Sequence, residues 1–251
     1  MKHLKKHKFK YLIISIVLVI VSICAYLVVW IGNPYSASEN AINILNQNPN
    51  ISRVNEDYLI AQPDESSKRG IIIYPGGLVE PEAYVTLSKG LADEGYFVAI
   101  IDMPWNLAVL DPLKGQEIIE EYDQIEEWII MGHSLGGSMA VRLAVESDKV
   151  VGLVLLASYP EGSLNISSED FKVLSISASN DMIINESNLI ESEKNLPVDT
   201  VYKVIEGGNH SQFGDYGLQE NDGVATISPE QQLDLVIQYL KEWDTPQNSE
   251  L

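Results

Sequence analysis

The residues best suited to chemistry lie in the stretch from Ile125 to Ser138. An apolar run, Trp128–Met131, leads there into Gly132-His133-Ser134-Leu135-Gly136, which fits the pattern G-x-S-x-G. This pattern is typical of a strand that turns sharply into a helix and holds a strained, exposed serine at the turn. The flanking glycines let the strand and the helix approach closely. We therefore predict Ser134 as a nucleophile and the Leu135 N–H as a donor to an oxyanion, with a turn that has no chemistry as the alternative.

A serine hydroxyl becomes a good nucleophile only when a base takes its proton. The chain has four histidines, of which His3 and His7 precede a long apolar segment and His133 lies beside Ser134, pointing away from it. His210 remains, in a Gly-Gly-Asn-His loop after the last expected strand. We predict that His210 is the base, and the alternative is an ordinary histidine in a surface loop.

The base in turn needs an acid that fixes its tautomer, and in the order Ser…Asp/Glu…His the acid precedes the histidine. Asp181 follows the expected strand 171–178 directly, at its carboxyl end. We therefore predict Asp181 as the acid, with an Asx-type turn as the alternative reading. Other carboxylates fit less well by position: Glu161, Asp170, Asp199 and, five residues beyond His210, Asp215.

A second oxyanion donor is expected from the loop after the first buried strand. Pro75-Gly76-Gly77-Leu78 occupies that place, and we assign the role to the Gly77 N–H, with Leu78 as the fallback and a plain type II turn as the alternative. Together these residues predict hydrolysis of a carboxylic ester or thioester through an acyl-enzyme, with no cofactor and no metal. An acyltransferase with the same triad and a non-catalytic, membrane-tethered binding module are the two alternatives.

The elements that must position these residues alternate between short apolar strands and helices. An edge strand is expected at 53–61, and buried strands at 70–74, 96–101, 128–133, 150–157, 171–178 and 200–205. Helices are expected at 81–94, 113–122, 137–146, 185–195 and 229–243, the last capped by Ser228 and opened by Pro229. This order predicts an α/β fold with a doubly wound, mostly parallel sheet, whose site forms at the carboxyl ends of the strands.

The chain resembles the α/β-hydrolase superfamily, and in particular its compact branch called the α/β-hydrolase fold-5 domain. The resemblance rests on Tyr74-Pro75-Gly76-Gly77-Leu78-Val79, Gly95-Tyr96, Ile101-Asp102-Met103-Pro104, the Ser134 motif, Asn180-Asp181, Gly207-Gly208-Asn209-His210 and Phe213-Gly214-Asp215-Tyr216-Gly217. It implies an esterase-like Ser/Asp/His triad and no cofactor. Related dienelactone hydrolases usually use a cysteine where this chain has Ser134.

The chain departs from many lipases of this superfamily, which insert a helical cap between two of the strands. Here only residues 158–170 separate those strands, so a site open to small or protruding substrates is expected.

Charge and cysteine content limit which partners and which cross-links the protein can have. Five of the 16 Lys and Arg residues lie in the first ten positions, so the remainder, with 11 basic and 36 acidic residues, carries about −25. Such a surface repels nucleic acid, and we expect no nucleic-acid partner. The only cysteine, Cys24, lies in the apolar segment, so an intrachain disulfide is excluded.

The segment from Tyr11 to Ile31 is nearly continuous in apolar residues and long enough to span a bilayer. Lysines crowd its N-terminal side, which predicts a cytoplasmic N-terminus and an extracytoplasmic catalytic domain on a single-pass membrane protein. The alternative is a cleaved signal peptide and a secreted protein. The expected organisation is a basic segment 1–10, a transmembrane helix 11–31, a stalk 32–52, a hydrolase domain 53–243 and a polar tail 244–251.

Overall fold

The computed structural model describes residues 2–162 and 164–245, and the chain divides between Pro34 and Tyr35 into two compact units. The first unit is helix α1 (Lys2–Ile31). Its segment Ile13–Ile31 has a mean hydropathy of 2.9, and none of that segment is buried. Among the described helices, α1 is the one long and apolar enough to cross a membrane, although a signal sequence has the same properties.

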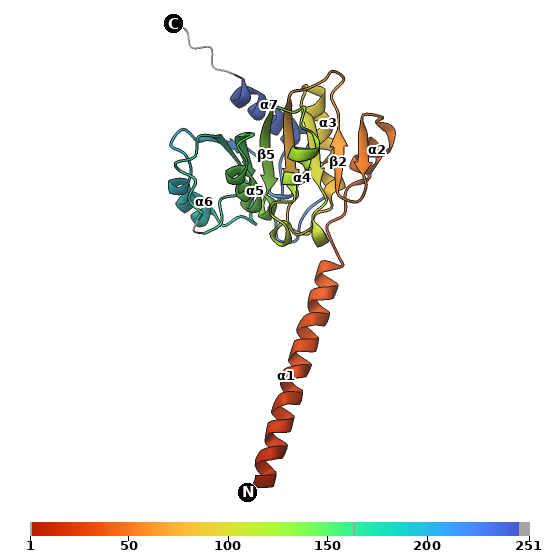
Figure 1. Ribbon diagram of the computed structural model, residues 1–251, viewed down its shortest axis with the longest axis vertical. Helices are drawn as coiled ribbons and strands as arrows, with labels where there is room; N and C mark the ends of the chain where they lie inside the picture. Colours follow the sequence, from red (N-terminus) through yellow and green to blue (C-terminus); the bar gives the residue numbers. More distant parts are fainter. Residues whose placement is uncertain (1, 163, 246–251) are drawn as a thin grey trace. The chain divides into compact units, whose positions relative to one another are not determined.

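The second unit is built on one eight-stranded sheet in the order β1-β2-β4-β3-β5-β6-β7-β8. Figure 1 shows this unit as a sheet with helices packed against it. The strands are β1 (Ile51–Val54), β2 (Tyr58–Ala61), β3 (Arg69–Tyr74), β4 (Phe97–Ile101), β5 (Glu127–His133), β6 (Val150–Leu156), β7 (Lys172–Ala178) and β8 (Val201–Ile205). From β4 to β8 neighbouring strands pair in parallel, while β2 pairs antiparallel with both β1 and β4. The mostly parallel sheet expected from the sequence is therefore confirmed.

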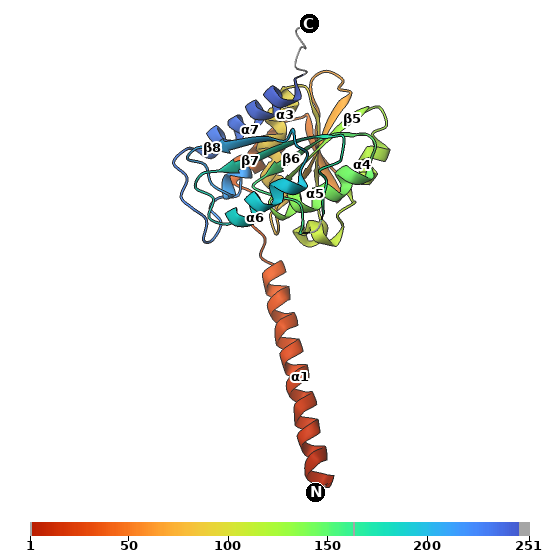
Figure 2. The same ribbon diagram turned by 90° about the vertical axis from the view of Figure 1, so that its left-hand side faces the viewer.

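Helices cover both faces of this sheet (Figure 2). One face packs on α3 (Val85–Asp93) and α7 (Pro229–Asp244), and the other packs on α4 (Gly115–Glu121) and α5 (Leu135–Glu146). Shorter elements complete the unit: α2 (Glu39–Gln47), α6 (Glu186–Ser192) and the 3₁₀ turns η1 (Pro81–Tyr84), η2 (Pro104–Asn106), η3 (Ala108–Leu110), η4 (Glu193–Asn195) and η5 (Ser211–Phe213).

The fully apolar strands follow from this two-sided burial. In β3, Ile71 and Ile73 join the core on one face, while Ile72 and Tyr74 join the core on the other. A parallel sheet covered on both faces needs apolar side chains at every position. All parallel strands point the same way, so the loops after β3, β4, β5, β7 and β8 gather at one edge, which we call the carboxyl edge.

Three local expectations differ from the structure. The single edge strand expected at 53–61 is a hairpin, because Asn55 adopts a positive φ of 51° and reverses the chain between β1 and β2. Asparagine tolerates this conformation better than most residues. The helix expected at 81–94 begins with a 3₁₀ turn. The compact unit starts at Tyr35, so most of the segment 32–52 that we expected as a stalk packs with the domain, where Ala41 is fully buried.

The C-terminal helix confirms the predicted cap. The Ser228 hydroxyl accepts from the Gln231 N–H, the Gln231 side chain accepts from the Ser228 N–H, and Pro229 occupies the first turn. Of the tail expected at 244–251, residues 246–251 lie outside the described part of the chain.

Candidate active site

Ser134 lies between the end of β5 and the start of α5, with φ 51° and ψ −124°. A positive φ is costly for a residue other than glycine, and such strain persists only where the surroundings enforce it. Two hydrogen bonds hold the turn: the Ser134 N–H donates to the Leu156 carbonyl at 3.0 Å, and the buried Ser158 hydroxyl donates to the Ser134 carbonyl at 2.7 Å. The turn therefore presents the Ser134 side chain at the carboxyl edge.

The glycines of the motif are required by close backbone contacts. A Cβ on Gly132 would lie 2.4 Å from Gly137 Cα, and a Cβ on Gly136 would lie 2.1 Å from the Pro75 carbonyl oxygen. A Cβ on Gly137 would lie 2.5 Å from Ser158 Oγ. Gly132 thus allows the strand and helix to meet, while Gly136 lets the helix approach the loop after β3.

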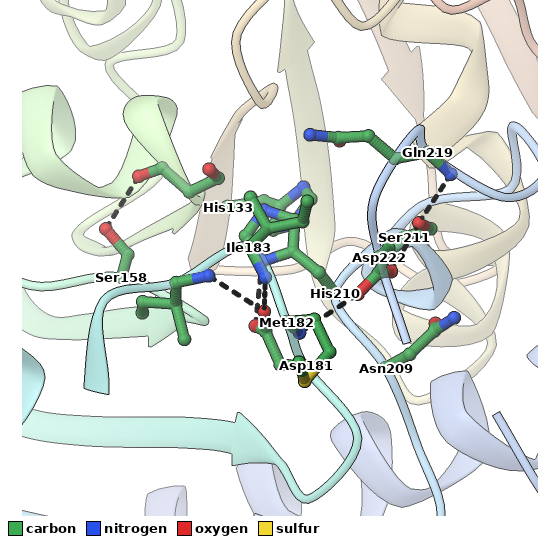
Figure 3. Close-up of polar contacts among 12 residues, drawn as sticks. His133, Ser158, Asp181, Met182, Ile183, Asn209, His210, Ser211, Gln219 and Asp222 are labelled. Atoms are coloured by element: carbon green, nitrogen blue, oxygen red, sulfur yellow. Dashed lines mark hydrogen bonds and ion pairs between the residues drawn. The ribbon is translucent and has the colours of Figure 1, made fainter. Parts of the chain in front are cut away.

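His210 and Asp181 meet at the same edge. His210 follows β8, Asp181 follows β7, and Nδ1 of the histidine lies 2.7 Å from Oδ2 of the aspartate (Figure 3). Both side chains are almost completely buried, with 2% and 1% of their surface exposed. An ionised carboxylate only accepts hydrogen bonds, so the Nδ1 atom carries the proton and Nε2 of neutral His210 is left as an acceptor.

The other carboxylate oxygen of Asp181 fixes the acid in place. Asp181 Oδ1 accepts from the N–H groups of Ile183 at 2.8 Å and Ile184 at 2.9 Å. This is the Asx-type turn that the sequence offered as an alternative to a catalytic role. The structure combines both arrangements, because one oxygen makes the turn and the other faces His210.

The backbone before His210 is clamped by a buried glutamine of α7. The Asn209 N–H donates to Gln232 Oε1 at 3.0 Å, and Gln232 Nε2 donates to the Asn209 carbonyl at 2.8 Å. Gln232 is 0% exposed. The Asn209 side chain also donates to the Gly223 carbonyl. These bonds fix the loop that carries the imidazole.

Asp222 links the loop of the acid to the loop of the histidine (Figure 3). Its Oδ2 accepts from the Ser211 N–H at 2.8 Å and from the Ser211 hydroxyl at 2.6 Å. Its Oδ1 accepts from the Met182 N–H at 3.3 Å. Ser211 follows His210 and Met182 follows Asp181, so one carboxylate spans the positions next to both members of the pair.

Both predicted oxyanion donors are among the backbone N–H groups near the serine that are without a described hydrogen-bond acceptor. They belong to Leu135, the first residue of α5, and to Gly77, whose added Cβ would lie 3.1 Å from a Leu135 side-chain carbon. Free donors at a helix N-terminus suit a developing negative charge. The fallback donor is excluded, because the Leu78 N–H already donates to the Asn106 carbonyl at 2.7 Å.

His133 is buried and belongs to a second network. The Tyr84 hydroxyl accepts from the Gly76 N–H at 2.8 Å and lies 2.7 Å from His133 Nδ1, so it donates to that nitrogen. The ring of His133 packs 4.7 Å, centroid to centroid, from that of His210. Burial lowers the pKa of His133 well below its usual value, and the neighbouring His210 lowers it further. His133 therefore stays neutral and its Nδ1 is occupied.

The Ser134 hydroxyl makes no hydrogen bond with the described residues, and none joins it to His210 in this state. Catalytic hydrogen bonds are often loose without substrate.

Asp215, the rival acid, is engaged by other residues, because its carboxylate accepts from Thr86 at 2.8 Å and from Asn40 at 2.9 Å. Among the described residues, no cluster of three or more metal-ligating side chains is present.

Sequence reasoning missed Gln232, Asp222 and Tyr84. Gln232 and Tyr84 lie on elements far from the motif in sequence, and Asp222 is one acid among 36. A glutamine at a core-facing position of the amphipathic C-terminal helix was the one available signal, because buried polar groups need partners.

Comparison with known proteins agrees with this architecture. A family model described as "Alpha/beta hydrolase family" matches residues 70–234. A comparison with curated proteins finds no match.

Solved structures share the fold at low identity. A predicted CIB-like hydrolase from Thermoplasma acidophilum has a TM-score of 0.58 and 18% identity, over 76% of this chain and 96% of the other. Carboxylesterase CesB (YbfK) from Bacillus subtilis has a TM-score of 0.58 and 10% identity, over 80% and 95%. A thermophilic esterase from Thermogutta terrifontis, Est2, has a TM-score of 0.54 and 13% identity, over 80% and 95%. At such identity the likeness shows the fold alone.

Proposed function

Because the chain belongs to the alpha/beta hydrolase family, we propose that it is a serine hydrolase that cleaves carboxylic esters or thioesters through an acyl-enzyme. The observation that carries this proposal is the buried 2.7 Å contact between His210 and Asp181, at the same sheet edge as the strained Ser134. A plain turn has no need of a buried acid–base pair. The two free N–H groups beside the serine support the same reaction.

Each residue then has a defined part in the reaction. His210 Nε2 takes the proton of the Ser134 hydroxyl as its oxygen attacks the substrate carbonyl. The N–H groups of Leu135 and Gly77 stabilise the oxyanion. Asp181 holds the imidazole in the required tautomer and stabilises its charged form. The protonated His210 gives its proton to the leaving alcohol or thiol, and then activates the water that releases the acid product.

We expect a small or exposed substrate, because the connection between β6 and β7 is short. The segment between β6 and β7, where a cap could be inserted, has turns and no helix in its described part. The cavities described elsewhere in the domain are not lined by Ser134, Asp181 or His210. Such an open site suits substrates whose ester protrudes from its carrier.

We further propose that α1 anchors the protein in the cell membrane, with the N-terminus cytoplasmic and the catalytic domain extracytoplasmic. The proposal is supported by the apolar segment Ile13–Ile31 and by the five lysines among residues 1–10.

Pre-steady-state kinetics with p-nitrophenyl acetate test the acyl-enzyme. We expect a burst of about one p-nitrophenolate per enzyme if deacylation limits turnover, and no turnover above background in Ser134→Ala. Ser147→Ala, at the far end of α5, is the matched control and should behave as wild type. Turnover retained in Ser134→Ala would overturn the assignment. Product analysis with an added alcohol separates hydrolysis from acyl transfer.

A further inference from the structure

The first residues of the catalytic unit are attached to the loop proposed to bind the oxyanion. The Tyr35 N–H donates to the Leu78 carbonyl at 2.7 Å, the Glu80 N–H donates to the Tyr35 carbonyl at 3.1 Å, and Tyr35 forms a parallel bridge with Val79. The Ser38 N–H donates to the carbonyl of residue 215, in the loop after His210. The chain therefore enters the domain at the carboxyl edge, where Ser134 lies.

Only three residues, Gly32, Asn33 and Pro34, separate the end of α1 at Ile31 from Tyr35. At about 3.3–3.6 Å per residue, a fully extended chain carries the Tyr35 Cα no more than about 14 Å from that of Ile31. This limit follows from covalent length and holds for every orientation of α1. A bilayer that holds α1 therefore reaches close to the loop of Gly77.

Exposed apolar side chains lie in the loops at the same edge. They are between 52% and 76% exposed, and we call them the apolar rim: Trp105, Val109, Leu110, Met182, Leu218 and Val224. The first three follow β4, in the loop whose Asn106 carbonyl accepts from the Leu78 N–H. Met182 follows Asp181 directly, and Leu218 and Val224 lie in the loop after His210. The rim thus flanks the site at its oxyanion end and at its acid–base end.

The short link between α1 and Tyr35 favours a lipid bilayer over a separate protein as the partner of the apolar rim. Single exposed apolar residues, such as Val145 and Val198, are ordinary, but a group around an active site marks a contact surface for protein or lipid. If α1 is held in a bilayer, the chain enters that bilayer four residues before Tyr35. The lipid surface is then always near the apolar rim, so contact between them costs little entropy, as in an intramolecular binding event. A separate protein partner has no such advantage.

The charge of the domain defines the kind of lipid contact. Residues 11–251 carry about −25, so anionic headgroups are repelled. Contact must come from apolar and aromatic side chains that enter the interface, and tryptophan favours that position. We therefore expect contact with zwitterionic lipid and little dependence on salt.

We propose that the apolar rim rests on the lipid surface in which α1 is anchored, so that the site acts on ester bonds of membrane lipids at the level of the headgroups. The surface contact rests on the proposed anchor, and the substrate class rests on the proposed function. An open site beside a bilayer receives an ester that protrudes from the surface without needing a deep acyl pocket.

Site-directed fluorescence on the full chain in phosphatidylcholine vesicles tests the contact. In a Cys24→Ser background, single cysteines at Leu110, Val224 and Val198 carry an environment-sensitive nitrobenzoxadiazole label. Val198 is the matched control, since it is an exposed valine in the loop before β8, at the opposite edge. We expect shallow spin-labelled phosphatidylcholine to quench the labels at 110 and 224 more strongly than at 198, by about twofold or more. Equal quenching at all three positions, or at none, overturns the proposal.

A second measurement separates this proposal from the catalytic one. Quenching is repeated with Ser134→Ala, which should not change it, since the contact is independent of the nucleophile. Hydrolysis of p-nitrophenyl palmitate held in the same vesicles is then compared with that of soluble p-nitrophenyl acetate. We expect Leu110→Asp with Val224→Asp to lower the vesicle rate about tenfold relative to the soluble rate, and Val198→Asp to leave the ratio unchanged. Equal loss of both rates would show that the rim residues stabilise the fold and do not contact lipid, which would overturn the proposal.

Discussion

Asp181 divides its two carboxylate oxygens between a turn and His210, and this division makes a substitution informative. In Asp181→Asn, the Oδ1 atom can still accept from Ile183 and Ile184, so the loop keeps its bonds. The amide nitrogen then faces His210 Nδ1, and only the tautomer with a proton on Nε2 satisfies it. We expect kcat to fall by about 10²–10⁴ with KM little changed, measured on a p-nitrophenyl ester.

Asp215→Asn is the control for this substitution. The Asp215 carboxylate accepts from Thr86 and Asn40, and among the described residues it makes no hydrogen bond or ion pair with His210. Its replacement should therefore cost far less activity. An inactive but folded Asp215→Asn, beside an active Asp181→Asn, would transfer the role of the acid to Asp215.

His133 makes stability depend on pH in a defined direction. Burial lowers the pKa of His133 in the folded protein, while the unfolded chain takes up a proton near the ordinary value of 6.5. The unfolded state then binds more protons, so this group destabilises the fold as the pH falls below about 6.5, by at most about 1.4 kcal/mol per pH unit. Above that pH its contribution is constant.

His133→Gln tests this effect, because a glutamine oxygen can still accept from Tyr84 and carries no titrating group. We expect a smaller drop in the free energy of unfolding between about pH 7 and pH 5 for this variant than for wild type, measured by urea denaturation. Carboxylates contribute equally to both proteins and cancel in the difference. If the free energy of unfolding fell equally with pH in both proteins, the assignment of His133 as a neutral buried group would be contradicted.

At the scale of elements, α7 supports the catalytic loop through one buried side chain. Gln232→Met keeps the size of the side chain but leaves the buried N–H and carbonyl of Asn209 without partners. Each unsatisfied group costs about 1–3 kcal/mol, so we expect the free energy of unfolding to fall by about 2–4 kcal/mol. Activity should fall by about tenfold or more, because Asn209 directly precedes His210 and its displacement would move the imidazole.

Gln238→Met, an exposed position of the same helix, is the matched control and should change neither quantity much. Urea denaturation and kcat are measured on both variants. If Gln232→Met were as stable and active as Gln238→Met, the clamp would have no part in holding the loop.

The elements themselves were largely predictable, and their long-range contacts were not. Apolar runs such as Ile71–Ile73 and the cap at Ser228 carry local signals of period, turn and capping, so the strands and α7 could be read from the sequence. The hairpin at Asn55 was missed because one residue in a positive φ divides what looks like a continuous strand. The Gln232 and Asp222 contacts depend on how distant loops meet, which no local pattern encodes.

For the candidate site, chain order and strand ends led to the predicted residues, because only one histidine and few acids occupy suitable places. The sequence placed Gly77 before Leu78 as the second oxyanion donor, and the structure adds that the Leu78 N–H already donates to the Asn106 carbonyl, a bond that nothing in the sequence indicates. The roles of Ser134, Asp181 and His210 in catalysis stay predictions, which the variants of these residues test.

At the scale of the whole molecule, the charge asymmetry around α1 predicts how the protein behaves in cells. If α1 is an uncleaved anchor, washing membranes with alkaline carbonate should leave the full-length chain in the pellet, because an apolar segment of 19 residues stays in the bilayer. Mass spectrometry of the pellet should find the N-terminal lysines. Recovery of a shortened chain in the supernatant would instead identify a cleaved signal and a secreted enzyme.

The most direct test of the central claim is labelling of the native protein with a fluorophosphonate probe, which reacts only with an activated serine. We expect a single label, located at Ser134 by peptide mass spectrometry, that is lost in Ser134→Ala and strongly slowed in His210→Gln. Ser147→Ala should label as wild type does. A folded wild-type protein that does not label at Ser134, or that labels equally well without His210, would contradict the proposed serine hydrolase mechanism.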